Sequence, residues 1–359
     1  MIIRNESKII ERVINSTIGV IDAICICDTG SSFEEFQKTR TILEKYDPIN
    51  IYIYKHAWKN FGYNRTKSFN ACRKCAEEEG YELKDTYALL LDADMELIVN
   101  DGFNKSNLMN LCYNLLQGNQ GLEYYNTRLI RLDNEWKCYG VTHEYWSCEK
   151  CPYQCKKERQ QSLWIKDHGD GGCKQNKFER DISLLKQGLQ DEPENTRYIF
   201  YLAQSYRDIG DKLKAIEFYK KHAASNAWDE ERWYSMMQIG LCADNFNDKT
   251  SWLVKAHEFR PGRAEPLYHL AVLFRMNNMW YDSFRYAWLG LMVPYPINDV
   301  LFIETSIYNY RLLYEISISA YYVPEWRMYG KWACEKLLNM HLPDDVLQDV
   351  RRNIHFYIE

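Results

Sequence analysis

Apolar residues in the first half of the chain alternate between two patterns. Short apolar runs predict buried strands, and longer amphipathic stretches predict helices. In chain order we expect strand 2–3, helix 8–16, strand 21–27, helix 33–46, strand 51–55, helix 64–79, and strands 87–91, 124–132 and 162–165. This alternation is typical of a mostly parallel α/β sheet that binds ligands at the carboxyl ends of its strands.

After about residue 178 the pattern becomes continuously helical, with a 34-residue period that is typical of tetratricopeptide repeats. Two such periods separate the matching triplets Leu202, Ala203, Tyr206 and Leu270, Ala271, Phe274. Ile199, Trp233 and Leu267 follow at single periods, while Gly240 interrupts the middle repeat at its aromatic position. The aromatic stripe Tyr198, Tyr201, Tyr206 is interpreted as core, with a ligand-binding surface as the alternative.

Length and charge limit the classes of partner. The 359 residues are enough for two domains, and 50 acidic against 45 basic side chains give a net charge of −5. Nucleic acid is therefore not an expected partner. We expect no secretory signal and no transmembrane segment, because no apolar run reaches about 18 residues. The expected location is the cytoplasm.

Twelve cysteines are expected to be mostly free thiols, since no secretory signal is predicted. Cys148, Cys151 and Cys155, flanked by Cys138 and Cys173, leave a structural zinc site open as an alternative.

Asp92-Ala93-Asp94 directly follows the predicted strand 87–91. Two carboxylates at the end of a buried strand suit a divalent cation that neutralises a nucleotide diphosphate. A solvated turn or a helix cap is the structural alternative for the same carboxylates.

Several motifs in order resemble glycosyltransferase family 2, whose fold is GT-A. They are Ile3-Arg4-Asn5-Glu6-Ser7, Cys27-Asp28-Thr29-Gly30-Ser31, Trp58-x-x-Phe61-Gly62-x-Asn64-Arg65, Leu91-Asp92-Ala93-Asp94 and Tyr139-Gly140-Val141-Thr142-His143-Glu144. The helical half resembles the tetratricopeptide-bearing branch of that family. The resemblance implies a GT-A catalytic domain with a Rossmann-like mixed sheet at 1–178 and a tetratricopeptide-like helical domain at 179–359.

The resemblance also implies an enzyme: a metal-dependent, inverting transferase that moves a sugar from a nucleotide diphosphate, with a UDP-sugar as the expected donor. Asp94, Asp92 and His168 would hold Mn²⁺ or Mg²⁺. The residues expected to bind the nucleotide sugar are Arg4, Asn5, Glu6, Asp28, Arg65, Asp92 and Lys177.

Inversion by single displacement needs a carboxylate that takes the proton of the acceptor hydroxyl. We assign this role to Glu144, beside His143, with Trp146 positioned to stack on a sugar ring. The acceptor class stays open between a glycan, a lipid-linked sugar and a protein. Charged residues expected on the repeat surface are candidates for an acceptor-binding wall: Arg207, Asp208, Glu230, Glu231, Arg263 and Glu265.

Structural alternatives stand beside these roles. Asp28 could close an Asx turn, and Arg65 could be a surface charge on an amphipathic helix. His143 and Glu144 could form a structural hydrogen-bonded pair, and His168 could belong to a glycine-rich linker.

Two other functions remain open. Nucleotidyl or phosphoryl transfer would want a Gly-rich, Lys-containing loop after the first strand, and Arg4-Asn5-Glu6 provides none. A non-catalytic scaffold, which binds a nucleotide sugar without turnover while its tetratricopeptide repeats bind a partner, is the alternative from a different class. The helical domain is also a candidate for homodimer formation.

Overall fold

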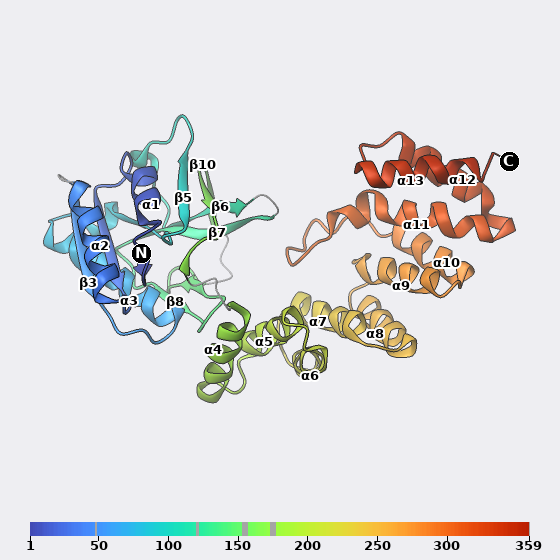
Figure 1. Ribbon diagram of the computed structural model, residues 1–359, viewed down its shortest axis with the longest axis horizontal. Helices are drawn as coiled ribbons and strands as arrows, with labels where there is room; N and C mark the ends of the chain where they lie inside the picture. Colours follow the sequence, from blue (N-terminus) through green and yellow to red (C-terminus); the bar gives the residue numbers. More distant parts are fainter. Residues whose placement is uncertain (47–48, 120–121, 153–156, 173–176, 359) are drawn as a thin grey trace. The chain divides into compact units, whose positions relative to one another are not determined.

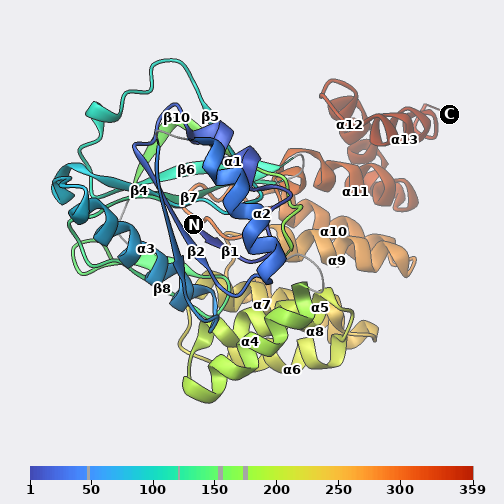
Figure 2. The same cartoon turned by 60° about the vertical axis from the view of Figure 1, so that its left-hand side comes forward.

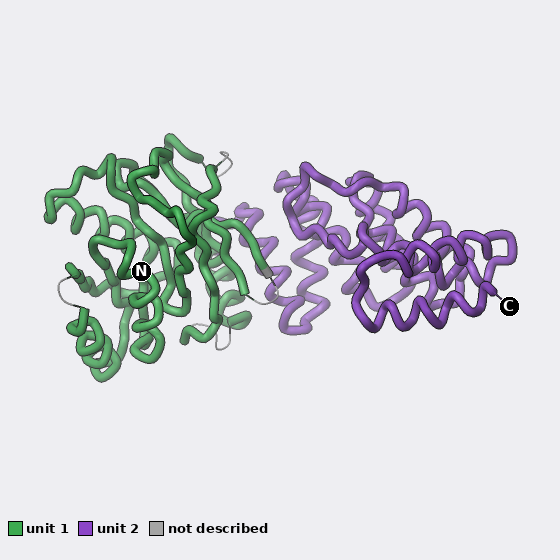
Figure 3. The backbone as a smooth tube through the Cα atoms, turned by 90° about the horizontal axis from the view of Figure 1, so that it is seen from above, with its two compact units in different colours: residues 1–188 green, residues 189–359 purple. Residues whose placement is uncertain are grey.

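A computed structural model describes residues 1–46, 49–119, 122–152, 157–172 and 177–358. The chain divides into two compact units, Met1–Gly188 and Leu189–Glu359, coloured separately in Figure 3. The first unit combines strands and helices, and the second is built from helices, as Figure 1 shows. An α/β part followed by a helical part is the coarse organisation that the sequence predicts.

The α/β unit carries most of the predicted elements within a few residues of their expected bounds. Its strands are β1 (Ile2–Ile3), β2 (Ala23–Asp28), β3 (Asn50–Lys55), β4 (Tyr87–Leu89), β5 (Met95–Val99), β6 (Cys112–Asn119), β7 (Leu122–Arg131), β8 (Lys137–Tyr139), β9 (Tyr145–Ser147) and β10 (Glu158–Asp167). Its helices are α1 (Ile10–Thr17), α2 (Phe33–Leu43), α3 (Phe61–Glu78) and α4 (Lys177–Asp191), the last crossing the boundary between the units. Figure 2 shows α1 and α2 beside each other.

The described strands form separate sheets instead of the single mixed sheet expected of a Rossmann-like GT-A domain. Strands β1, β2 and β3 make a parallel sheet, and five strands make a mixed sheet in the order β4-β7-β6-β10-β5. Strand β4, which precedes the paired aspartates, is antiparallel to β7. The sequence therefore predicts the strand but not its neighbour, because a short apolar run does not specify which edge it joins.

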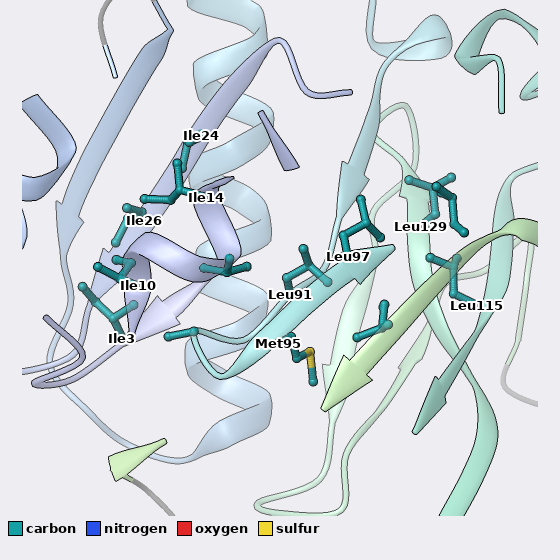
Figure 4. Packing of buried hydrophobic residues seen from close by; sticks show 14 of the residues in the cluster. Ile3, Ile10, Ile14, Ile24, Ile26, Leu91, Met95, Leu97, Leu115 and Leu129 are labelled. Carbon is teal, nitrogen blue, oxygen red and sulfur yellow. The ribbon is translucent and has the colours of Figure 1, made fainter. Parts of the chain in front are cut away.

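Isoleucine and leucine side chains fill the core of the α/β unit. Ile10 and Ile14 of α1 pack with Ile26 of β2, and all three are fully buried. Figure 4 shows these isoleucines together, with Leu115 and Leu129 of β6 and β7 in the same cluster. β-Branched residues suit the pleated surface of a buried parallel sheet, which explains their density here.

Gly62, in the first turn of α3, lets this helix approach the loop after β8. Its N–H donates to the Gly140 carbonyl at 3.0 Å. A Cβ at this position would lie 2.7 Å from the Cys138 carbonyl oxygen and closer still to that of Gly140. We therefore expect Gly62→Ala to lower the free energy of unfolding by about 1–3 kcal/mol, since two main-chain segments would have to separate. Urea unfolding measures this loss.

Gly19→Ala is the matched control, because a Cβ at Gly19 would meet no atom within 4 Å. Equal urea midpoints for the two variants would show that the backbone around Gly62 relaxes without cost.

The second unit is a stack of antiparallel helices. They are α5 (Thr196–Asp208), α6 (Lys212–Ala223), α7 (Asp229–Cys242), α8 (Phe246–Phe259), α9 (Glu265–Met276), α10 (Trp280–Leu291), α11 (Leu312–Ser319), α12 (Arg327–Leu338) and α13 (Asp344–His355), with a π-helical turn Ile307–Arg311 before α11. Asn195, Asp211 and Asn245 cap α5, α6 and α8 through their side-chain oxygens. Across the described residues, no helix is long and apolar enough to cross a membrane.

The predicted repeat positions form the contacts between paired helices. Leu202, Ala203, Leu270 and Ala271 are fully buried, as the tetratricopeptide-like period requires. Gly240 occupies the aromatic position of the middle repeat, and a Cβ there would lie 2.9 Å from Leu253 Cγ. The glycine therefore allows α7 and α8 to pack closely, which explains why the middle repeat looks degenerate in sequence.

Candidate functional site

The predicted carboxylate pair lies on the turn between β4 and β5. Asp92 is held by Arg65 of α3 through two hydrogen bonds, Nη1 to Oδ1 at 2.6 Å and Nη2 to Oδ2 at 3.0 Å. Arg65 Nε also donates to Glu144 Oε1 at 2.5 Å. One guanidinium thus bridges a predicted ligand and the predicted base, and Arg65 is not the surface charge of the structural alternative.

Burial and charge act in opposite directions on this group. Burial by itself would raise the pKa of Asp92, but the charges of Arg65 and Arg128 outweigh it and lower the pKa well below its usual range. Burial would likewise lower the pKa of Arg65, and the carboxylates of Asp92 and Glu144 raise it instead. Asp92 and Arg65 therefore stay charged at neutral pH, and Arg65 is ion-paired with both Asp92 and Glu144.

Arg128 is a residue that the sequence analysis missed. It lies on β7, with Nη1 3.7 Å from Asp92 Oδ2, and its Nε donates to Gln117 Oε1 at 2.9 Å. The sequence signal that could have identified it is an arginine inside a predicted buried strand, because an arginine is seldom buried without a carboxylate partner.

Asp94 and Glu6 form a second, more acidic part of the site. Glu6 is buried and accepts the Gly172 N–H at 3.3 Å, and its pKa is raised by burial and by the negative charges of Asp94, Asp170 and Asp92. A Cβ on Gly171 would come within 3.1 Å of Asp94 Oδ2, so the glycine segment lies directly against that carboxylate.

His168 contacts the Asp94 main chain, but its ring contacts another acid. Its backbone N–H donates to the Asp94 carbonyl at 3.1 Å, while Nε2 lies 2.7 Å from Glu96 Oε2. Among the described residues, no three His, Cys, Asp or Glu side chains form a group suited to hold a metal ion. Mn²⁺ or Mg²⁺ at this place stays a prediction.

The residues near the first strand have structural partners. Asp28 Oδ1 accepts the N–H groups of Gly30 and Ser31, both at 2.8 Å, which is the Asx turn of the structural alternative. Asn5, at φ +58°, accepts the Ser32 N–H at 2.9 Å through its side-chain oxygen. Arg4 is exposed.

His143 and Lys177 lie at α4. The ring of His143 lies 3.8 Å from the buried Asp181 of this helix, and Thr142 Oγ1 donates to the same carboxylate at 3.2 Å. Lys177 begins the helix, with its ammonium 5.8 Å from the Phe178 ring. His143 therefore faces an acid that the sequence analysis did not single out.

The cysteine cluster is only partly described. Cys148 and Cys151 exchange two main-chain hydrogen bonds, each of 3.1 Å. Cys148 is a free thiol, whereas Cys151 is disulfide-bonded, so the expectation of free thiols is wrong at Cys151. Cys155 and Cys173, two of the five cysteines of the zinc alternative, lie outside the described residues.

The helical unit contains a different polar site. Glu230, Glu231, Arg263 and Glu265 were expected on the repeat surface, and this is wrong: all four are buried, with Arg263 and Glu265 at 0% exposure. Arg263 Nη2 donates to Glu265 Oε1 at 2.7 Å, and its guanidinium lies 3.9 Å from the Trp233 ring centre.

Two of these side chains, Glu230 and Arg263, bind the main chain of residues 293–304, a segment that we call the strap. It joins α10 to the helix beginning at residue 305 and appears in Figure 1 as a long loop. Glu230 Oε2 accepts the N–H groups of Val300 and Leu301 at 3.0 and 2.8 Å. Arg263 donates to the carbonyl oxygens of Leu301 and Phe302, both at 3.2 Å. Side chains from two repeats thus satisfy consecutive peptide groups.

No protein-family model matches the chain, and no curated protein matches it. Matching solved structures include MamA protein, with 19% identity over 47% of this chain and 90% of MamA and a TM-score of 0.36. They also include YrrB, a tetratricopeptide repeat protein with an unusual peptide-binding site, at 10% identity over 49% and 84% of the chains and TM-score 0.37. A third, the tetratricopeptide repeat protein TTC0263 of Thermus thermophilus, has 13% identity over 51% and 92% and TM-score 0.31.

These findings contradict the expected membership in glycosyltransferase family 2. The absence of a matching family model and the tetratricopeptide repeat neighbours leave the enzyme assignment unsupported. The predicted metal-dependent, inverting hexosyl transfer from a UDP-sugar is therefore wrong as the main function. The interpretation of Asp92-Ala93-Asp94 as a DxD motif for a UDP-sugar falls with this assignment.

Proposed function

We propose that this protein is a non-catalytic scaffold whose helical unit binds an extended segment of a partner protein. One observation carries the proposal: Glu230 and Arg263 together make four hydrogen bonds to the main chain of the strap. Main-chain recognition tolerates different side chains, as in other modes of peptide binding. Among the glycan, lipid-linked sugar and protein considered as acceptors from the sequence, a protein is the class that offers main-chain groups for such hydrogen bonds.

The ion pairs of the α/β unit support a binding role over proton transfer. A general base needs a carboxylate free to accept a proton from a bound hydroxyl. Glu144 is instead engaged by Arg65 at 2.5 Å, and Asp92 by the same guanidinium. These contacts suit a charged network that holds α3 against the end of β4. Homodimer formation through the helical unit stays a prediction.

A selection experiment tests the proposed function. The full chain is immobilised and exposed to a displayed library of random dodecapeptides, with Val300→Pro as a second target because it lacks one main-chain donor to Glu230. We expect enriched sequences to bind one or both targets, and to lose at least about tenfold in affinity when Glu230→Gln replaces the anionic acceptor.

Asp345→Ala is the control, since Asp345 is an exposed carboxylate at the start of α13. Selection without enrichment on either target would overturn the proposed function. If the enriched peptides bind the Glu230→Gln variant with the same affinity as the wild-type chain, the peptide-binding site does not include Glu230.

A further inference from the structure

The main chain of the strap is hydrogen-bonded to side chains of the helical unit, while several of its apolar side chains are exposed. Val300 is 77% exposed and Ile297 83%, although both are large and apolar. Besides the hydrogen bonds to Glu230 and Arg263, the Glu304 N–H donates to Glu265 Oε1 at 3.3 Å. An exposed apolar segment held by its peptide groups resembles a bound peptide more than a packed core segment.

Asp299 supplies the strap's charged anchor. Arg260 binds its carboxylate with two hydrogen bonds, Nε to Oδ2 at 2.7 Å and Nη2 to Oδ1 at 2.5 Å. Arg263 Nη1 adds a third contact to Oδ2 at 3.3 Å. The hydrogen bond from Arg260 is the largest cause that lowers the pKa of Asp299 below its usual range. A fork of two donors gives this position a strict preference for a carboxylate.

Phe302 supplies an aromatic anchor three residues later. Its ring centre lies 4.7 Å from that of Tyr234 on α7, yet the side chain is 46% exposed. Its backbone has φ +44°, in the left-handed region that bulky residues rarely adopt. The strap therefore makes its aromatic contact at a conformational cost that a separate peptide, free to approach with an extended backbone, does not share.

We propose that the strap is an internal ligand that occupies the partner site, and that the partner displaces it with an extended segment carrying Asp three positions before an aromatic residue. This rests on the proposed function. The Asp of the partner pairs with Arg260 and Arg263, its main chain takes the hydrogen bonds of Glu230, and its aromatic ring packs on Tyr234. Because the strap is part of the same chain, its effective concentration at the partner site is high. The closed state, in which the strap occupies this site, therefore dominates in the free protein.

A labelled peptide with the strap sequence Pro-Ile-Asn-Asp-Val-Leu-Phe-Ile-Glu, residues 296–304, tests the proposal by fluorescence anisotropy on the full chain. Val300→Pro removes one strap N–H while its side chain lies mostly in solvent, and Val300→Ala keeps that donor as the matched control. We expect the peptide to bind Val300→Pro at least about tenfold more tightly than Val300→Ala or the wild-type chain, since a larger fraction of open sites raises the apparent affinity.

Asp299→Ala opens the strap by a second route and identifies the anchor. We expect the peptide to bind this variant at least about tenfold more tightly than the wild-type chain. Adding Arg260→Gln, or changing the peptide Asp to Ala, should each reverse the gain, and the two changes together should cost no more than one alone. Such non-additivity is the signature of a direct contact between the two groups.

The outcomes separate the two proposals. If library peptides bind the helical unit but the opened variants bind them no better than the wild-type chain, the strap is a structural connection and this inference falls while the proposed function stands. If circular dichroism shows folded Val300→Pro and Asp299→Ala chains and neither binds the strap peptide, the inference is overturned. If the library selection also enriches no peptide, the proposed function is overturned too.

Discussion

Replacement of Arg65 by methionine is expected to lower the free energy of unfolding of the α/β unit by about 3–5 kcal/mol. Methionine keeps much of the side-chain volume but leaves Asp92 and Glu144 without the charge that both contact at 2.5–2.6 Å. The three side chains are only 15–22% exposed, so water replaces the lost contacts poorly. Urea unfolding, followed by hydrogen exchange of α3 peptides, measures the loss.

Arg12→Met is the matched control, because the pair between Arg12 and Asp170 is also bidentate but more exposed. Exposed ion pairs of this kind contribute about 0–1 kcal/mol to the free energy of unfolding. If Arg65→Met costs no more than this control, the network around Asp92 is as well solvated as a surface pair.

The effect of Arg65 has a defined pH dependence. Because the folded pKa of Asp92 is lowered, its contribution to stability is present above the unfolded pKa of about 3.9 and is lost as pH falls through the folded value. Without Arg65, the charge of Arg128 still opposes the effect of burial, but the larger contribution is lost. The pKa of Asp92 is therefore higher in the variant than in the wild type, and protonation relieves the poorly paired charge. The stability difference between wild type and Arg65→Met should therefore be largest near pH 7 and shrink below about pH 4.

The periodic parts of the fold follow from the sequence alone. The elements predicted at 21–27, 33–46 and 51–55 appear as β2, α2 and β3, with ends shifted by up to three residues, and the burial of Leu202 and Leu270 matches the 34-residue period. These segments carry their signal locally, through spacing and caps. Strands β5 and β6 were missed because their patterns are irregular. Strand β5 pairs with β10, which lies far away in sequence, and β6 pairs with both β10 and the neighbouring β7.

The sites were harder to predict because each depends on distant partners. Asp28 ends a strand, a position where carboxylates often bind ligands. Its Oδ1 instead accepts two N–H groups of a local turn. Glu230 of α7 and Arg263 of the loop before α9 are charged residues of the repeats, which indicates a solvated surface, but both are buried and bind the strap, which follows α10. Asp-x-Asp triplets recur in many unrelated proteins, so Asp92-Ala93-Asp94 at a strand end does not by itself identify a family.

Arg263→Met is expected to lower the free energy of unfolding of the helical unit by about 3–5 kcal/mol, the cost of leaving a buried carboxylate unpaired. Arg263 and Glu265 are both fully buried, so Glu265 loses the guanidinium that binds it at 2.7 Å. It keeps the hydrogen bonds from the Tyr308 hydroxyl, also at 2.7 Å, and from the Glu304 N–H. The strap loses the donors to two carbonyls. Thermal unfolding, together with faster hydrogen exchange at residues 299–304, measures both consequences.

Arg285→Met is the matched control, since Arg285 is 57% exposed in a pair with Asp282 on α10. The double variant Arg263→Met/Glu265→Gln should recover part of the loss, because it also removes the charge of the carboxylate that Arg263→Met leaves without its guanidinium. A double variant no more stable than Arg263→Met would show that the loss comes from the missing strap contacts and from the packing of Arg263 on Trp233, rather than from the orphaned carboxylate.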